Sequence, residues 1–113
     1  MKIKGERIAS FLMKEINDIL YNKVRDKVIQ GTSVTSVNLS SDYEYAKVYC
    51  INLNDNKDTI KELNKSKGFI KSELYKRKLP LRVLPELEFI YDESIEYAKK
   101  IEDKIKEIND VKR

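Results

Sequence analysis

The chain has no histidine and only one cysteine among its 113 residues, and both shortages remove classes of chemistry. Histidine is the commonest general base near neutral pH and the commonest metal ligand, so neither role has its usual residue here. Cys50 has no second cysteine for an internal disulfide, and it stands in an apolar run, where a thiol packs as a small hydrophobe. We therefore expect no catalytic residues, no metal site and no cofactor site, and hence a protein that is not an enzyme.

Long apolar runs are also missing. No stretch reaches the roughly 18 apolar residues of a membrane-spanning helix. The opening residues, MKIKGE, carry charge and lead into an amphipathic pattern instead of the apolar core of a signal peptide, so we expect a cytoplasmic location. With 41% hydrophobic and 37% charged residues, the length fits one globular domain over 1–113, with flexible ends at about 1–4 and 109–113.

The spacing of the apolar residues predicts a helix, two strands, a helical stretch, a third strand and a last helix. The first helix carries apolar residues at three- and four-residue spacing, namely Ile8, Phe11, Leu12, Ile16, Ile19 and Leu20. Strand-forming residues over 33–39 and 45–53, separated by Ser40-Ser41-Asp42, predict an antiparallel hairpin. In its second strand we expect one side to face the helices, the side of Ala46, Val48 and Cys50.

Apolar spacing also predicts the elements in the second half of the chain. Apolar residues at every second or fourth position predict a third strand over 82–92, with Val83, Leu87, Phe89 and Tyr91. Helical spacing returns after Asp92 and predicts a last helix that carries Ile95, Ala98, Ile101, Ile105 and Ile108.

The helical stretch between Lys57 and Leu79 has one residue out of pattern. Wound as a single helix, it places Lys67 inside the apolar stripe of Ile60, Leu63, Ile70 and Leu74. A break at Ser66-Lys67-Gly68 would release the lysine, with backbone freedom from Gly68 and a helix cap from Ser66. We predict two helices joined by a sharp kink; the alternative is one continuous helix whose Lys67 extends past the edge of the core.

Positive charge is concentrated in the same region. Residues 57–82 contain nine basic and three acidic residues, a net charge of +6 in a chain whose total is +4. A basic surface with no catalytic residues beside it is typical of a protein that binds a polyanion, most simply nucleic acid. Lysines offer point charges to phosphates, and arginines can bind them bidentately. The candidate RNA-binding residues are Lys65, Lys67, Lys71, Lys76, Arg77, Lys78 and Arg82; the alternative is a solvated helix face.

Two further groups stay open. One is a second basic group, which shares its turn with Asp26: Lys23, Arg25 and Lys27. RNA binding and simple exposure to solvent are equally good explanations for it. The other consists of tyrosines that could stack on bases, although tyrosines in strands more often pack half-buried: Tyr43, Tyr45 and Tyr49.

Carboxylates gather at the start of the predicted last helix, as Asp92, Glu93 and Glu96. There they favour the helix dipole and cap its amides, which we expect to be their role. Magnesium would need further oxygen ligands in octahedral geometry, and no acidic motif elsewhere supplies them. Residues 86–113 carry a net charge of −3, so the chain has opposite charge in its middle and at its end.

Several short stretches occur in one order along nearly the whole chain: Ser33-Val34-Thr35-Ser36-Val37, Ser41-Asp42, Ala46-Lys47-Val48-Tyr49, Lys67-Gly68-Phe69-Ile70-Lys71-Ser72-Glu73-Leu74, Leu81-Arg82, Pro85-Glu86-Leu87-Glu88-Phe89, Asp92-Glu93-Ser94-Ile95 and Ile101. Together they resemble ribosome-binding factor A, a family of bacterial small-subunit assembly proteins. The resemblance implies an α+β, type II KH-like domain, with a three-stranded sheet, helices on one face and the order α-β-β-α(kink)α-β-α. In this family an Ala-x-Gly helix kink replaces the Gly-x-x-Gly loop of other KH domains. The matching residues here are Ser66-Lys67-Gly68, with serine in place of alanine.

The resemblance also implies a function. The protein would bind the immature 30S subunit through 16S rRNA, assist maturation of the 16S 5′ region, and matter most in the cold. Without a Gly-x-x-Gly clamp, we expect recognition of RNA shape and phosphates rather than of sequence. We expect a monomer with the 30S subunit and 16S rRNA as partners. The alternatives are a KH-like module that binds other RNA, and a protein-interaction domain that uses the open face of the sheet.

Overall fold

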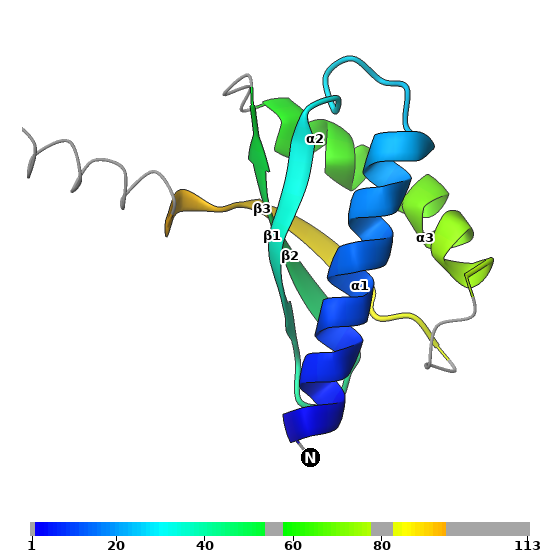
Figure 1. Cartoon of the computed structure of the whole chain (residues 1–113), viewed down its shortest axis with the longest axis vertical. Coiled ribbons are helices and arrows are strands. Elements are labelled where there is room, and N and C mark those ends of the chain that lie inside the picture. Colours follow the sequence, from blue (N-terminus) through cyan, green and yellow to red (C-terminus); the bar gives the residue numbers. More distant parts are fainter. Residues whose placement is uncertain (1, 54–57, 78–82, 95–113) are drawn as a thin grey trace, which may run out of the picture.

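The computed structural model describes residues 2–53, 58–77 and 83–94. In chain order the elements are α1 (Lys2–Asn22), β1 (Thr32–Leu39), β2 (Tyr45–Asn52), α2 (Asp58–Lys65), α3 (Lys67–Tyr75) and β3 (Glu86–Tyr91), as Figure 1 shows. These are the predicted elements in the predicted order. The last helix, expected over Ile95–Ile108, lies outside the described residues. None of the helices described here is long and apolar enough to cross a membrane.

The three strands form one sheet in the order β1-β2-β3. The β1–β2 hairpin is antiparallel, whereas β3 pairs parallel to β2. A parallel neighbour needs a crossover connection, and α2 and α3 lie in that crossover. The register of β1 shifts between Val34 and Ser36, so Thr35 forms a bulge. This pairing places the helix pair and α1 on the same side of the sheet (Figure 1).

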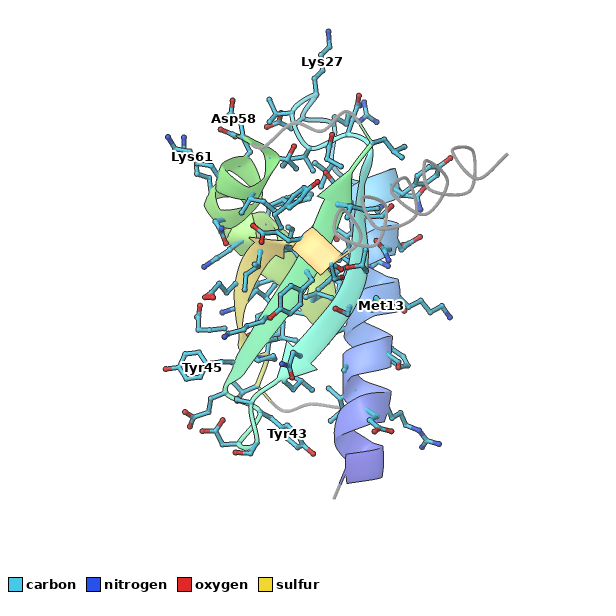
Figure 2. The ribbon with its side chains drawn as sticks, turned by 90° about the vertical axis from the view of Figure 1, so that its left-hand side faces the viewer. Met13, Lys27, Tyr43, Tyr45, Asp58 and Lys61 are labelled. Atoms are coloured by element: carbon cyan, nitrogen blue, oxygen red, sulfur yellow. The ribbon has the colours of Figure 1, made fainter. Side chains whose placement is uncertain are left out.

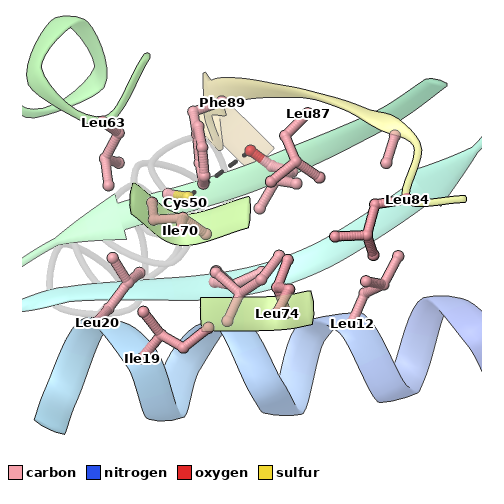
Figure 3. Close-up of a cluster of buried hydrophobic side chains, with 14 of the residues drawn as sticks. Leu12, Ile19, Leu20, Cys50, Leu63, Ile70, Leu74, Leu84, Leu87 and Phe89 are labelled. Atoms are coloured by element: carbon pink, nitrogen blue, oxygen red, sulfur yellow. Dashed lines mark hydrogen bonds between the residues drawn. The ribbon is translucent and has the colours of Figure 1, made fainter. Parts of the chain in front are cut away.

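A single hydrophobic core fills the space between the sheet and the helices. Ala46, Val48 and Cys50 are buried on the inner side of β2, which confirms the predicted orientation of that strand. Figure 3 shows how the three helices and the sheet contribute to the core through Leu12, Ile19, Leu20, Leu63, Ile70, Leu74, Leu87 and Phe89. The core therefore joins elements that are far apart in sequence.

Two expected core residues are exposed. Phe11 remains 39% exposed, because at about 100° per residue it lies at the edge of the α1 stripe and not at its centre. Val83 is 72% exposed, because β3 begins only at Glu86, after Pro85, so position 83 is not part of the strand. The prediction for both residues was wrong.

Both edges of the sheet are closed by an asparagine from a helix. On β1, Asn17 of α1 accepts from the Val34 N–H at 2.6 Å and donates to the Val34 C=O at 3.2 Å. On β3, Asn64 of α2 accepts from the Phe89 N–H at 3.1 Å and donates to the Phe89 C=O at 3.2 Å. Each amide replaces one residue of a missing neighbouring strand, so these positions cannot pair with another chain.

Candidate nucleic-acid interface

The predicted helix kink is present. Helix α2 ends at Lys65, α3 begins at Lys67, and Ser66 stands between them with φ −93° and ψ 8°. The Ser66 N–H donates to the carbonyls of Glu62 and Leu63, both at 3.0 Å, and the Ser66 carbonyl accepts from the Ile70 N–H at 3.1 Å, so Ser66 links the two helices. Leu63 before the break and Ile70 after it are fully buried, whereas Lys67 is only half-buried. The break therefore keeps the apolar stripe in the core and the lysine outside it.

The cause of the kink differs from the prediction in two respects. The Ser66 side chain makes no capping hydrogen bond to α3. Gly68 does not adopt a positive φ; among the described glycines only Gly31 does, at 85°. A Cβ atom at Gly68 would meet no atom within 4 Å, so nothing inside the described chain requires glycine there. Packing of both helix segments on one core explains the break, and Gly68 leaves an exposed, bare stretch of backbone beside it.

Three lysines precede this bare backbone on α2 and at the start of α3, and we call them the kink lysines: Lys61, Lys65 and Lys67. Lys61 and Lys65 are one helical turn apart on α2, so they share a face. Lys61 extends away from the helix in Figure 2, and neither it nor Lys67 forms an ion pair with any described residue. Lys65 lies 3.6 Å from Glu62, with its side chain 64% exposed, a contact that contributes little. Among the described residues, no carboxylate pairs with Lys61 or Lys67, and only the weak Glu62 contact compensates Lys65.

Of the other predicted lysines, Lys71 is paired and Lys76 makes only a weak contact like that of Lys65. The Lys71 ammonium donates to Glu86 at 3.0 Å and joins α3 to the start of β3. Lys76 lies 3.6 Å from Glu73 in the last turn of α3, although its side chain is 69% exposed. Lys78 and Arg82 lie outside the described residues. The structure therefore brings Lys65 and Lys67 together at the kink, and places Lys71 and Lys76 further along α3.

Arg77 has a structural role that the sequence did not indicate. Its guanidinium donates to Glu15 at 2.8 Å and to Asp18 at 2.5 Å, and its side chain is only 19% exposed. The hydrogen bond from Arg77 holds the pKa of Asp18 below its ordinary value, and the bond to Glu15 is the largest cause of a raised pKa at Arg77. Arg77 therefore fastens the end of α3 to α1, with its guanidinium bound to two carboxylates of the same chain.

Two of the three candidate tyrosines are half-buried, and Asp92 takes a structural position. Tyr43 is half-buried in the hairpin loop with φ 62°, Tyr49 is half-buried, and Tyr45 is 60% exposed. Asp92 accepts hydrogen bonds from the Ser94 N–H and hydroxyl, as a helix cap does, and another from the Thr35 hydroxyl. These bonds, chiefly the one from the Ser94 hydroxyl, lower the pKa of Asp92. The expected capping role of Asp92 is confirmed.

Cys50 is fully buried, and burial raises the pKa of its thiol to about 12. A thiolate is the nucleophilic form of cysteine, so this thiol is inert at neutral pH. The described residues also contain no group of three or more histidine, cysteine, aspartate or glutamate side chains that could hold a metal ion.

The sheet pairing, the helix pair in the crossover and the helices on one face define a KH-like domain. The crystal structure of ribosome-binding factor A from Thermus thermophilus shares the fold, with a TM-score of 0.70 and 21% identity, over 77% of this chain and 94% of that one. A Thermus thermophilus homology model, fitted into a cryo-EM map of a 30S complex, gives a TM-score of 0.67 at 20% identity, over 79% of this chain and 96% of that one.

Sequence comparison is more specific. The chain matches the family model of ribosome-binding factor A over residues 4–105. Ribosome-binding factor A of Staphylococcus carnosus is 46% identical over 111 residues, which is 96% of each chain. The chain belongs to the ribosome-binding factor A family.

Proposed function

We propose that this protein is a non-catalytic assembly factor that binds the small ribosomal subunit through 16S rRNA. The relatives are named for ribosome binding, and the Thermus thermophilus homolog was fitted into a map of its complex with the 30S subunit. In this proposal the protein acts as a monomer in the cytoplasm, assists maturation of the 16S 5′ region, and is needed most in the cold.

The observation that carries the proposal is the exposed Gly68 backbone between uncompensated lysines. In KH domains a glycine-containing loop lets the backbone of the protein approach the backbone of four nucleotides. Here a bare helix start takes the place of that loop, and the kink lysines precede it on α2 and at the first residue of α3. Phosphate oxygens can accept hydrogen bonds from the lysines while the sugar-phosphate chain lies against Gly68.

The mechanism is differential binding. A factor shifts the folding of rRNA only if it binds one conformation more tightly than another. Contacts to phosphates depend on where the RNA backbone is placed in space, so a rigid basic surface selects a fold and not a sequence. Binding ends when maturation moves the phosphates away from the lysines.

Co-sedimentation with purified 30S and 50S subunits tests this function. Wild-type protein should sediment with 30S subunits and not with 50S subunits. The Gly68→Ala variant should remain folded, because its added methyl group meets no atom of the described chain and alanine favours a helix. It should nevertheless bind 30S subunits about tenfold more weakly, because the methyl group separates the helix from the RNA backbone.

The two parts of the proposal fail separately in this experiment. Absence of wild-type binding to 30S subunits would contradict the assembly-factor function. Normal binding by Gly68→Ala would leave the function in place and contradict its location at the kink. Binding to unrelated RNA with equal affinity would favour a general KH-like RNA-binding module.

A further inference from the structure

A groove lies at the end of α1, away from the kink, where the chain turns into β1. Its volume is about 440 Å³, within the usual range for a ligand site. Leu20 and Val24 form its apolar wall, while Tyr21 and Leu53 line it with side chains that are 88% and 83% exposed. Two large apolar side chains so open to water are unusual on a chain this polar, and both belong to the same groove.

The groove is held open by the backbone around it. Gly31 has φ 85°, a conformation that favours glycine, and its C=O accepts from the Leu53 N–H at 3.0 Å. The buried Asn52 amide donates to the Gln30 C=O at 3.2 Å and to the Thr32 hydroxyl at 3.0 Å. These bonds fix both sides of the turn, so a ligand would meet a formed site.

Three cations belong to the loop after α1, which also supplies Val24 and Gln30 to the groove. Lys23, Arg25 and Lys27 are exposed, and within the described residues none of the three forms an ion pair. Asp26, the acidic residue between them, accepts a hydrogen bond from the Val28 N–H at 2.9 Å, which stabilises the turn that contains it. Asp18, on the last turns of α1, is bound by Arg77 and Asn22. Among the described residues, both of these carboxylates are thus hydrogen-bonded, and neither forms an ion pair with Lys23, Arg25 or Lys27.

We propose that this groove holds an unstacked base of the bound RNA, with its phosphates on Lys23, Arg25 and Lys27. An exposed tyrosine beside several cations is the combination that binds single-stranded nucleic acid, because the ring stacks on a base while the cations hold the backbone. The Gln30 amide and the Ser33 hydroxyl also line the groove, and neither side chain has a hydrogen-bond partner among the described residues. They can bind the polar edge of a base. This inference rests on the proposed RNA-binding function and adds a second contact to it.

The loop beside the groove is fastened to the start of α2. The Thr59 hydroxyl of α2 donates to the Val28 C=O at 2.8 Å, so the loop that carries the three cations is fastened to the helix that carries Lys61. Figure 2 shows Lys27 and Lys61 at the same end of the molecule. An RNA strand that leaves the kink lysines along α2 therefore reaches the groove.

Fluorescence anisotropy with a labelled single-stranded RNA of about ten nucleotides, the length that such sites accommodate, tests the groove directly. Tyr21→Ala should weaken binding about tenfold, because stacking on one base is lost. Tyr21→Phe keeps the ring and should bind like wild type. Tyr45→Ala is the matched control, since Tyr45 is also exposed but lies at the opposite end of the molecule in Figure 2.

A salt series in the same assay separates the contribution of base stacking to affinity from the contribution of the cations. Tyr21→Ala should leave the slope of log K against log salt unchanged, whereas replacing Lys23, Arg25 and Lys27 by glutamine should reduce it by about two. Wild-type affinity in Tyr21→Ala, or equal losses in Tyr21→Ala and Tyr45→Ala, would overturn the proposal. Binding of a polyglutamate peptide at the groove, without binding of the RNA, would overturn it as well. If any of these results came with normal binding to 30S subunits, the assembly-factor function would stand and only the groove would be rejected.

Discussion

Arg77 shows how a basic residue is withdrawn from a binding surface by its own chain. Sequence spacing placed it among the RNA-binding candidates, because its partners Glu15 and Asp18 are 62 and 59 positions away and no local pattern indicates them. In the structure its guanidinium lies between those two carboxylates and joins α3 to α1. Charge concentration in a sequence therefore predicts where positive charge is present, and only the fold shows which part of it is available.

The role of Arg77 can be separated from RNA binding by measuring stability. Arg77→Gln should lower the free energy of unfolding in urea by about 1 kcal/mol, the range for a charged, partly exposed hydrogen bond. Glu15→Gln should lower it similarly, and the double variant should lose less than the sum of the two. Unchanged stability together with lost 30S binding would instead make Arg77 an RNA ligand.

The same contact has a pH dependence with a definite sign. The pKa of Asp18 is lowered from its ordinary 3.8, so its contribution to stability is present above that value and is lost as the pH falls through the lowered pKa. In urea titrations the difference between wild type and Arg77→Gln should therefore shrink in acid. A difference that persisted at a pH well below 3.8 would contradict a carboxylate partner.

The sequence predicted the helices and strands more completely than it predicted the roles of single residues. Apolar spacing predicted the order of the described helices and strands, the inner side of β2 and the break at Ser66, because burial on one face imposes a regular period. Apolar spacing did not predict the exposure of Phe11, which lies at the edge of the α1 stripe. Nor did it predict the exposure of Val83, which fits the alternating pattern but precedes the strand. It was silent on the asparagine bonds to the sheet edges, since these depend on how a helix lies against a strand.

These edge bonds lead to a prediction about α2. Asn64→Ala would leave the N–H and C=O of Phe89 without their partners in a part-buried position, which should lower the free energy of unfolding by about 2 kcal/mol. Asn64→Asp has the same shape and can still accept from the Phe89 N–H, but cannot donate to its C=O. Urea unfolding should rank its stability between wild type and Asn64→Ala. An Asn64→Ala variant as stable as wild type would show that the edge bonds contribute nothing.

On the scale of the whole molecule, two groups of described cations belong to the proposed RNA surface: the kink lysines, and Lys23, Arg25 and Lys27. The Thr59–Val28 hydrogen bond joins the loop of Lys23, Arg25 and Lys27 to the start of α2, and the kink lies at the other end of that helix. The basic residues further along α3 are partly neutralised by Glu86, Glu73 and the carboxylates of α1. The sequence indicated a basic segment over 57–82; within its described residues, Lys61 and Lys67 form no ion pair, whereas Lys71 and Arg77 are bound to carboxylates.

The most direct test of this account is a salt series of 30S binding with two variants of equal net charge. One variant replaces the kink lysines Lys61, Lys65 and Lys67 by glutamine. The other replaces three exposed cations without ion pairs among the described residues, on α1 and the open face of the sheet: Arg7, Lys14 and Lys47. We expect the first variant to lose affinity and to reduce the slope of log K against log salt by about two to three, and the second to bind like wild type. Equal losses in both variants would show that only net charge matters and would contradict a binding surface at the helix kink.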